Sequence, residues 1–152
     1  MRIKKTEEQL REVSDHLHYE IWMFSTITQT LALGAFGPGP VNNACLESFA
    51  IHARVLLAFF YAQEPREDDV IAEDFFSTSD EWQKARPSMS KSLQTVHKRV
   101  GKELAHLTYA RLDVTSEAKI WAFVEMDNDM AAVVKKFLDL VRKNLLGEQW
   151  KN

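Results

Sequence analysis

An arginine and a histidine, Arg99 and His106, have the spacing in this sequence that most suggests chemistry. On a helix, seven residues make almost two turns, so the two side chains lie within roughly 20° of each other on one face. A histidine beside fixed cations can act as an acid or a base near neutral pH, and an arginine can hold a phosphate. The alternative is a solvated helix face with an incidental histidine, because any charged helix offers such pairs.

The helix that carries this pair is predicted to start at Ser88 or Ser90 and to run to about Tyr109. Its apolar stripe consists of Leu93, Val96, Val100, Leu104 and Leu107. The face with Arg99 and His106 points roughly 120–140° away from this stripe. We therefore expect that face to meet solvent, a groove or another subunit, and not the core.

A second group of polar residues, Glu47, His52 and Arg54, interrupts the most apolar stretch of the chain, Asn42–Tyr61. A helix that is apolar on nearly every side is usually buried on all sides. Glu47 and Arg54 share one face, whereas His52 points roughly 140–160° away from both. The pattern predicts a structural polar network: Glu47 and Arg54 as a buried ion pair, joined by an acid from residues 68–74, and His52 as a hydrogen-bonded core histidine.

A metal site is a further alternative. Glu103 and His106 have the Glu-x2-His spacing of di-iron bundles, and Asp15 and His18 mimic it. Both pairs lie off the apolar stripes of their helices, so the ligand set is incomplete. We expect no metal and no cofactor, and a di-iron-type metalloprotein is the third alternative. Two further acids could point into the interior, namely Glu20 and Glu47.

The first predicted helix begins at a capping box. Thr6 takes the N-cap position and Gln9 reaches back to it, and apolar residues then recur every three or four positions. The helix extends over about Glu7–Leu33. It ends at Gly34 and at the alternating glycines and prolines of residues 37–40.

Two more helices and a long connection complete the predicted elements. The central helix covers Asn42–Tyr61 and takes its cap from Asn42 or Asn43. Residues 64–87 form a long connection that is irregular or partly helical. The last helix runs over about Glu117–Leu146. Four long helices without a persuasive strand signal predict an all-α four-helix bundle.

The bulk composition fits one helical domain over residues 1–152. A net charge of -3 gives no bulk attraction to nucleic acid, so any such contact would need a local basic patch. The single cysteine, Cys45, excludes an intrachain disulfide and favours a reducing compartment. The N-terminal residues are too polar for a secretory signal, and no apolar run approaches a membrane span. We expect a soluble cytoplasmic protein that does not bind membranes.

The fuller pattern resembles a known superfamily. A four-helix plan with Arg-x6-His on a late helix, here Arg99 and His106, resembles the HEPN superfamily of small all-α domains. Its signature is an arginine, four to six residues and a histidine, and many members are metal-independent RNases that act as dimers. Members often have Asn, Asp or His directly after the arginine, where this chain has Val100. The succession of ESFAIHAR, AEDFF, a tryptophan and ELAHLTYAR is similar to uncharacterised bacterial helical proteins.

This resemblance implies cleavage of RNA by its own 2′-hydroxyl, without a metal. His106 would act as base or acid, and Arg99 would stabilise the charge that develops on the phosphate. Two such faces across a two-fold axis would form one cleft in a homodimer. Lys98, Lys102 and Arg111 would add contacts to the RNA backbone.

Two classes of function follow from the sequence. The first is a metal-independent endoribonuclease, or an RNA-binding HEPN-like protein, that acts as a dimer. The alternative is a non-enzymatic helical protein that binds a protein partner. A large exposed apolar patch without an aligned Arg–His cleft would favour the second class.

Overall fold

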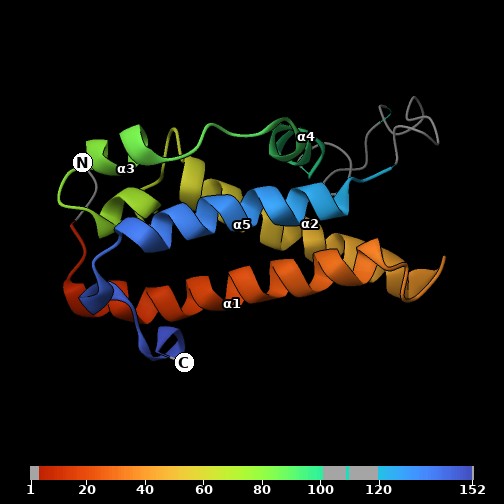
Figure 1. Cartoon of the computed structure of the whole chain (residues 1–152), viewed down its shortest axis with the longest axis horizontal. Coiled ribbons are helices and arrows are strands. Elements are labelled where there is room, and N and C mark those ends of the chain that lie inside the picture. Colours follow the sequence, from red (N-terminus) through yellow and green to blue (C-terminus); the bar gives the residue numbers. More distant parts are fainter. Residues whose placement is uncertain (1–3, 101–108, 110–119, 152) are drawn as a thin grey trace.

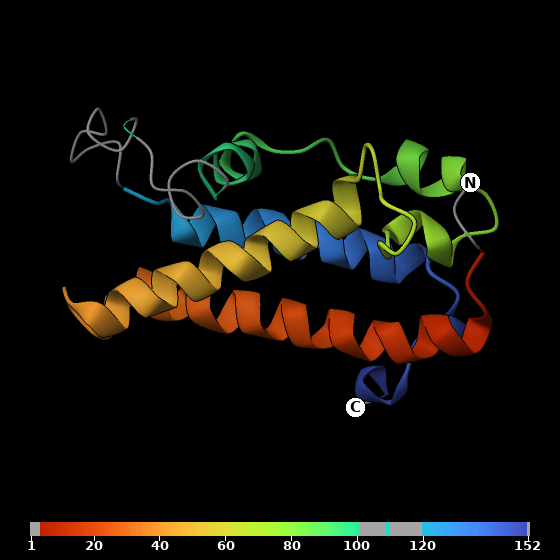
Figure 2. The same ribbon diagram turned by 180° about the vertical axis from the view of Figure 1, so that it is seen from behind.

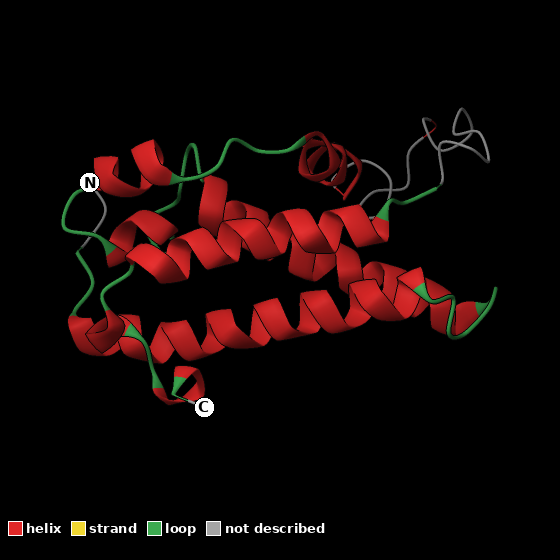
Figure 3. Ribbon diagram, in the orientation of Figure 1, coloured by secondary structure: helices red, strands yellow, loops and turns green. Residues whose placement is uncertain are grey.

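The computed structural model describes residues 4–100, 109 and 120–151, and this part of the chain is all-helical (Figure 1). Its described residues form helices joined by loops and include no strand (Figure 3). The predicted all-α class is therefore confirmed. The five described α-helices are α1 (Glu7–Ala32), α2 (Pro40–Tyr61), α3 (Ser79–Ala85), α4 (Lys91–Arg99) and α5 (Phe123–Leu140).

Helices α1, α2 and α5 make up the body of the described structure. Both α2 and α5 run antiparallel to α1 and pack against it, and the shorter α4 lies against α2 and α5 (Figures 1 and 2). Burial of large apolar side chains between these helices is the main stabilising contribution. The largest fully buried side chains include Phe24, Phe49, Leu56, Phe60, Leu93, Val96, Met130 and Phe137.

The start of α1 confirms the predicted capping box. The amide of Gln9 donates to Thr6 Oγ1 at 3.1 Å, and the amide of Thr6 donates to Gln9 Oε1 at 2.9 Å. Together these bonds satisfy two amides that a helix start leaves without partners. The helix ends at Ala32, followed by Gly34 with φ of 61°, a left-handed conformation that glycine adopts without strain.

The cap predicted for α2 is wrong. The helix begins at Pro40, so Asn42 and Asn43 already lie inside it, and the N-cap residue is Gly39, which makes no side-chain cap. Proline favours the first turn of a helix because its φ is preset and its missing N–H would have no partner there. The glycine before it supplies a φ of 147°, which other residues rarely adopt.

The connection between α2 and α4 is partly helical, one of the two predicted forms, and is packed against α2 and α5. It contains the 3₁₀ helix η1 (Ala72–Phe75) and the seven-residue α3. Trp82 of α3 is fully buried, and its Nε1–H donates to the carbonyl of Phe60 at 2.9 Å. Its ring also meets that of Phe137 edge-on at 5.6 Å. This anchor joins the connection to α2 and α5.

The last helix is shorter than predicted. Residues 120–122 are not helical and α5 begins at Phe123, while residues 117–119 lie outside the described part of the chain. The helix ends at Leu140, because Val141 turns to an extended conformation. The chain then forms the 3₁₀ helix η5 (Lys143–Leu145), which packs against α1 and buries Leu145 completely. The apolar residues that suggested a longer helix are thus buried by a turn in the chain.

By length and composition alone, α2 could cross a membrane, and among the described helices no other could. In this structure, 44% of its most apolar window is buried inside the molecule. The core helix of a soluble protein has the same properties, so this is weak evidence for a membrane span.

Candidate functional site

Arg99 is the last residue of α4 and is held against the segment that precedes α5. Its Nη1 donates to the carbonyl of Ile120 at 3.0 Å, and its Cζ lies 3.7 Å from the centroid of the Trp121 ring. A guanidinium over an indole face is a favourable cation–π contact. Trp121 in turn packs edge-on against Phe49 of α2 at 5.4 Å. Arg99 therefore fixes the end of α4 to the start of α5, with part of its side chain still exposed.

The rest of the predicted RNA site is described only in part. Lys98 precedes Arg99 and is exposed, whereas Lys102, His106 and Arg111 lie outside the described residues. Leu93, Val96 and Val100 of the α4 stripe are buried, as the periodicity indicated. The alignment of Arg99 with His106 stays a prediction.

The prediction that Glu47 and Arg54 are buried is wrong. Both side chains are exposed on the outer side of α2, and neither has an ion-pair or hydrogen-bond partner in the described part of the chain. The apolar composition of α2 suggested burial on all sides, but α1, α4 and η1 cover only part of it. Ile51 and Val55 are exposed on the same side. This outer side of α2 is therefore a mixed apolar and charged surface.

His52 is buried and hydrogen-bonded, which agrees with its predicted role. Its Nδ1 lies 2.6 Å from Glu20 Oε2 of α1, and only 8% of the residue is exposed. The Tyr19 ring packs edge-on against the imidazole at 5.9 Å. A carboxylate–histidine pair can carry out proton transfer where a substrate reaches the ring. Here the ring is enclosed, so the pair's visible role is to join α1 to α2.

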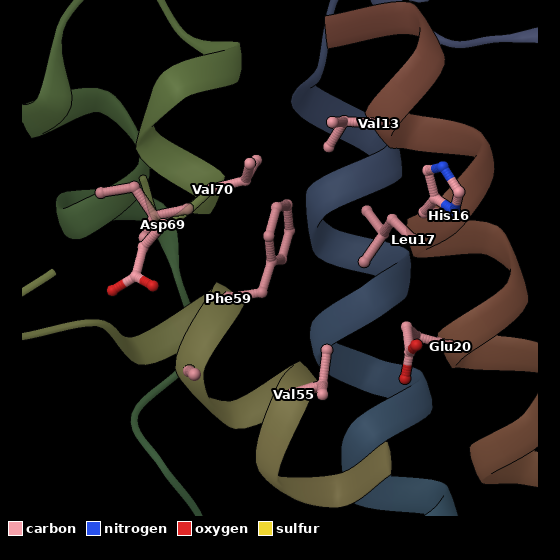
Figure 4. Close-up of a pocket in the computed structure, with 10 residues that line it drawn as sticks. Val13, His16, Leu17, Glu20, Val55, Phe59, Asp69 and Val70 are labelled. Atoms are coloured by element: carbon pink, nitrogen blue, oxygen red, sulfur yellow. The ribbon is translucent and has the colours of Figure 1, made fainter. Parts of the chain in front are cut away.

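A groove lies beside this pair, between α1, α2 and residues 69–71 (Figure 4). Its volume is about 360 Å³ and its lining is mostly apolar. Val70 and Phe59 project towards α1 across the groove, whereas the carboxylate of Asp69 turns away from it (Figure 4). Such a lining suits an apolar side chain better than a charged substrate. Its other lining residues are Val13, His16, Leu17, Glu20, Val55, Ala58 and Ile71.

A buried carboxylate in the connection went undetected in the sequence. Glu73 of η1 is buried, and both of its carboxylate oxygens lack a hydrogen-bond partner among the described residues. The nearest cation is Arg86, whose Nη1 lies 3.8 Å from Glu73 Oε1, too far for a hydrogen bond. Burial raises the pKa of Glu73. Its own backbone amide, Arg86 and the Gln83 side chain are near the carboxylate but too poorly placed to hydrogen-bond it, and they offset this rise only in part.

Arg86 is shared among several groups at the C-terminal end of α2. It donates to the carbonyl of Phe60 at 3.2 Å and lies 5.3 Å from the Tyr61 ring. The Tyr61 hydroxyl donates to the carbonyl of Pro87 at 3.0 Å, and burial raises the pKa of Tyr61. The prediction that an acid of residues 68–74 joins Glu47 and Arg54 is therefore wrong: the acid of this segment that lies near an arginine is Glu73, and the arginine is Arg86. Nothing in the spacing of these two residues indicated the pair.

Metal ligands do not gather in the described part of the chain, where no group of three or more His, Cys, Asp and Glu side chains is placed to hold an ion. Asp15 accepts a hydrogen bond from the Gln149 amide at 3.0 Å, and His18 packs edge-on against Trp150 at 5.1 Å. These two residues therefore contact the C-terminal segment. Glu103 and His106 lie outside the described residues.

Helices α1 and α2 carry several exposed large apolar side chains. Ile51 is 62% exposed and Trp22 is 56% exposed, and Tyr19 links the two helices by ring contacts to Trp22 and to His52. Exposed tryptophan and tyrosine beside aliphatic residues are typical of protein interfaces. We define the outer face of α2 as the exposed residues between Ala44 and Ala58, namely Ala44, Glu47, Ile51, Arg54, Val55 and Ala58.

Comparisons of this chain with protein families, with curated proteins and with solved structures find no match.

Proposed function

We propose that this protein functions by binding another protein through the outer face of α2 and the neighbouring aromatic residues of α1. The observation that carries the proposal is the exposure of Ile51, Val55, Tyr19 and Trp22 on two adjacent helices. When a partner covers large apolar side chains that were in contact with water, the free energy of the system falls by roughly 25 cal/mol per Å² of apolar surface buried. The groove beside His16 and Glu20 extends this surface and can receive an apolar side chain.

The test compares binding by wild type with binding by two face variants, Ile51→Asp and Trp22→Glu. Proteins retained by the immobilised wild-type chain are identified and purified, and each is titrated by calorimetry against all three chains. Both substitutions place a charge where an apolar contact is needed, so we expect affinity to fall at least tenfold.

Gln94→Glu on α4 is the matched control, because Gln94 is exposed and lies outside the proposed surface. It should bind as wild type does. Equal affinity of Ile51→Asp, Trp22→Glu and wild type for every partner, including the chain itself, would rule the proposal out.

A second candidate function is RNA binding or metal-independent RNA cleavage by a HEPN-like four-helix bundle. The observation in its favour is the run of His97, Lys98 and Arg99 at the end of α4, beside the ring of Trp121. Cations next to an aromatic ring are a common setting for a nucleotide. In this proposal His106 and Arg99 act on the phosphate, and Lys98, Lys102 and Arg111 contact the backbone.

The RNA proposal is tested by incubating RNA with the protein in EDTA and comparing wild type with His106→Ala and Arg99→Ala. We expect cleavage by wild type and a loss of at least a hundredfold in both variants. For binding without cleavage, Lys98→Ala should weaken affinity and reduce the salt slope by about one. If all the chains give the same background cleavage and no salt-dependent binding, this candidate is excluded.

A further inference from the structure

On the outer face of α2, a negative and a positive charge lie at similar distances on either side of one residue along the helix. This residue is Ile51, Glu47 precedes it by four residues and Arg54 follows it by three. At 1.5 Å per residue, the acid lies about 6 Å and the base about 4.5 Å from Ile51 along the helix axis. Both charges lie on the same side of the line through Ile51, because residues seven apart differ by only about 20°.

This arrangement is complementary to itself. When two copies of α2 pack antiparallel about a two-fold axis at Ile51, a residue at one height faces the residue at the opposite height on the other copy. Glu47 of each copy then faces Arg54 of the other, and the two isoleucines meet at the centre. Neither charge has a partner in the described part of the chain, so both are available for these pairs.

We propose that the protein forms a homodimer through antiparallel packing of the outer faces of two α2 helices, with Glu47 and Arg54 paired across the two-fold axis. This inference rests on the proposed function, since it names a second copy of the chain as the partner at that surface. Ile51 lies between the two charges along the helix, and Val55 lies on its other side, so the apolar and the charged side chains form adjacent parts of one surface.

The ends of the face also suit close packing of two helices. Ala44 and Ala58 are exposed and lie seven residues on either side of Ile51, so the antiparallel arrangement brings them opposite each other. Small side chains at both ends let the helix axes approach to about 8–10 Å, the distance of packed helices. In Figure 2, α2 lies at the front of the molecule, and no other described helix passes in front of it.

A lipid surface suits this face less well than a second copy does. A helix that lies in a membrane interface has a charge-free apolar side, whereas Glu47 and Arg54 flank the middle of this one. The same charges would each find an opposite charge in the antiparallel dimer. Charge complementarity therefore favours the homodimer.

The test is a charge exchange followed by sedimentation and light scattering. Wild type should be a dimer. Glu47→Arg and Arg54→Glu should each dissociate at concentrations at least tenfold higher than wild type, because each places like charges at two symmetry-related contacts. The double variant E47R/R54E restores both pairs and should dimerise again. An equimolar mixture of the two single variants should form a heterodimer, since every contact then joins opposite charges.

Two charge reversals outside the face serve as controls, Glu67→Arg in the connection and Lys91→Glu at the start of α4, and both should dimerise as wild type does. Circular dichroism of every variant checks that these exposed substitutions leave the helices intact. The inference is overturned by a wild-type chain that stays monomeric, by single variants that dimerise as wild type does, or by a mixture that forms no heterodimer. Binding of the monomer to vesicles of phosphatidylcholine and phosphatidylserine, with no dimer in solution, would also overturn it.

The two proposals fail in different ways. If the chain is monomeric but Ile51→Asp still weakens a different purified partner, the homodimer is wrong and the proposed function stands. If Ile51→Asp changes no association at all, both proposals are wrong.

Discussion

Glu73 shows at the scale of single residues how burial outweighs an adjacent opposite charge. The carboxylate is enclosed in the connection, and Arg86 stands too far away to donate a hydrogen bond. Arg86 is also shared with the Phe60 carbonyl and the Tyr61 ring. The ionised form of Glu73 is consequently disfavoured in the folded protein, and its pKa is raised.

Replacing Glu73 with glutamine should stabilise the protein near neutral pH, because glutamine has a similar shape but lacks the charge that burial disfavours. A raised pKa means that the folded chain holds the proton more tightly than the unfolded chain. The protonated Glu73 therefore contributes its full stabilisation when the pH is below the pKa of glutamate in the unfolded chain. This contribution is lost as the pH rises through the raised pKa of the folded chain. Urea unfolding should show a gain for Glu73→Gln at pH 7 that shrinks towards pH 4. Glu67→Gln, at an exposed site of the same connection, should show no gain.

Arg99 combines a structural contact with a proposed role on RNA. We expect Arg99→Ala to lower the free energy of unfolding by about 1–2 kcal/mol, because it removes the stack on Trp121 and the bond to the Ile120 carbonyl. Lys98→Ala, next along the chain and exposed, should stay within about 0.5 kcal/mol of wild type. Chemical unfolding of both variants measures the difference. Equal stability of the two variants would show that the stack contributes nothing.

The C-terminal segment is the element whose position the sequence did not indicate. After α5, the chain crosses α1 through η5 and η6 (Glu148–Trp150). The amide of Gly147 donates to Ser14 Oγ at 2.7 Å, and Trp150 Nε1–H donates to the Ser14 carbonyl at 2.8 Å. Ser14 is thus the point on α1 at which this segment is held.

Substituting Ser14 with alanine should cost about 1–3 kcal/mol, because it leaves the buried amide of Gly147 without an acceptor. Amide hydrogen exchange should show faster exchange at Gly147, while residues in the middle of α2 keep their protection. Ser48→Ala, on α2, is the control, because the Ser48 side chain makes no hydrogen bond within the described residues. Unchanged protection at Gly147 would contradict the proposed docking contact.

Gly147 itself is a second test of the same element. A Cβ atom at this position would lie 2.4–2.5 Å from the carboxyl group of Asp15, which also accepts a bond from the Gln149 amide. Gly147→Ala should therefore destabilise the protein by about 1 kcal/mol, because the Asp15 carboxyl group must move and then loses its hydrogen bond from the Gln149 amide. Thermal unfolding of Gly147→Ala measures this, and Gly147→Ala in an Asp15→Ala background should recover part of the loss.

At the scale of the whole molecule, the outer face of α2 links stability to concentration. If the face is covered by a second copy, the melting temperature of wild type should rise by about 2–4 °C for each tenfold increase in concentration. The melting temperature of the Ile51→Asp variant should not change over the same range of concentrations, because a charge at position 51 prevents a second copy from packing on the outer face. Scanning calorimetry at three concentrations checks this. If the melting temperatures of the two chains depend on concentration in the same way, self-association does not depend on Ile51.

The sequence alone predicted those features that depend on neighbours along the chain. The start of α1 is one example, because Thr6 and Gln9 satisfy each other's amides within a single turn. The all-helical class is another, since it follows from apolar residues recurring with the period of a helix. The buried stripe of α4 also follows from the local pattern. Each of these needs only information that lies within a few turns.

Only the tertiary structure decided which sides of the helices are covered. Composition indicated that α2 is buried all round, yet its neighbours leave Glu47, Ile51 and Arg54 in contact with solvent. The same is true of Arg99, whose partner Trp121 lies on another segment, and of Glu73, whose burial depends on how the connection packs. Helical periodicity defines faces, but how many neighbours pack against each face is a property of the assembled fold. The outer face of α2, on which the proposed interaction rests, is therefore visible only in the folded chain.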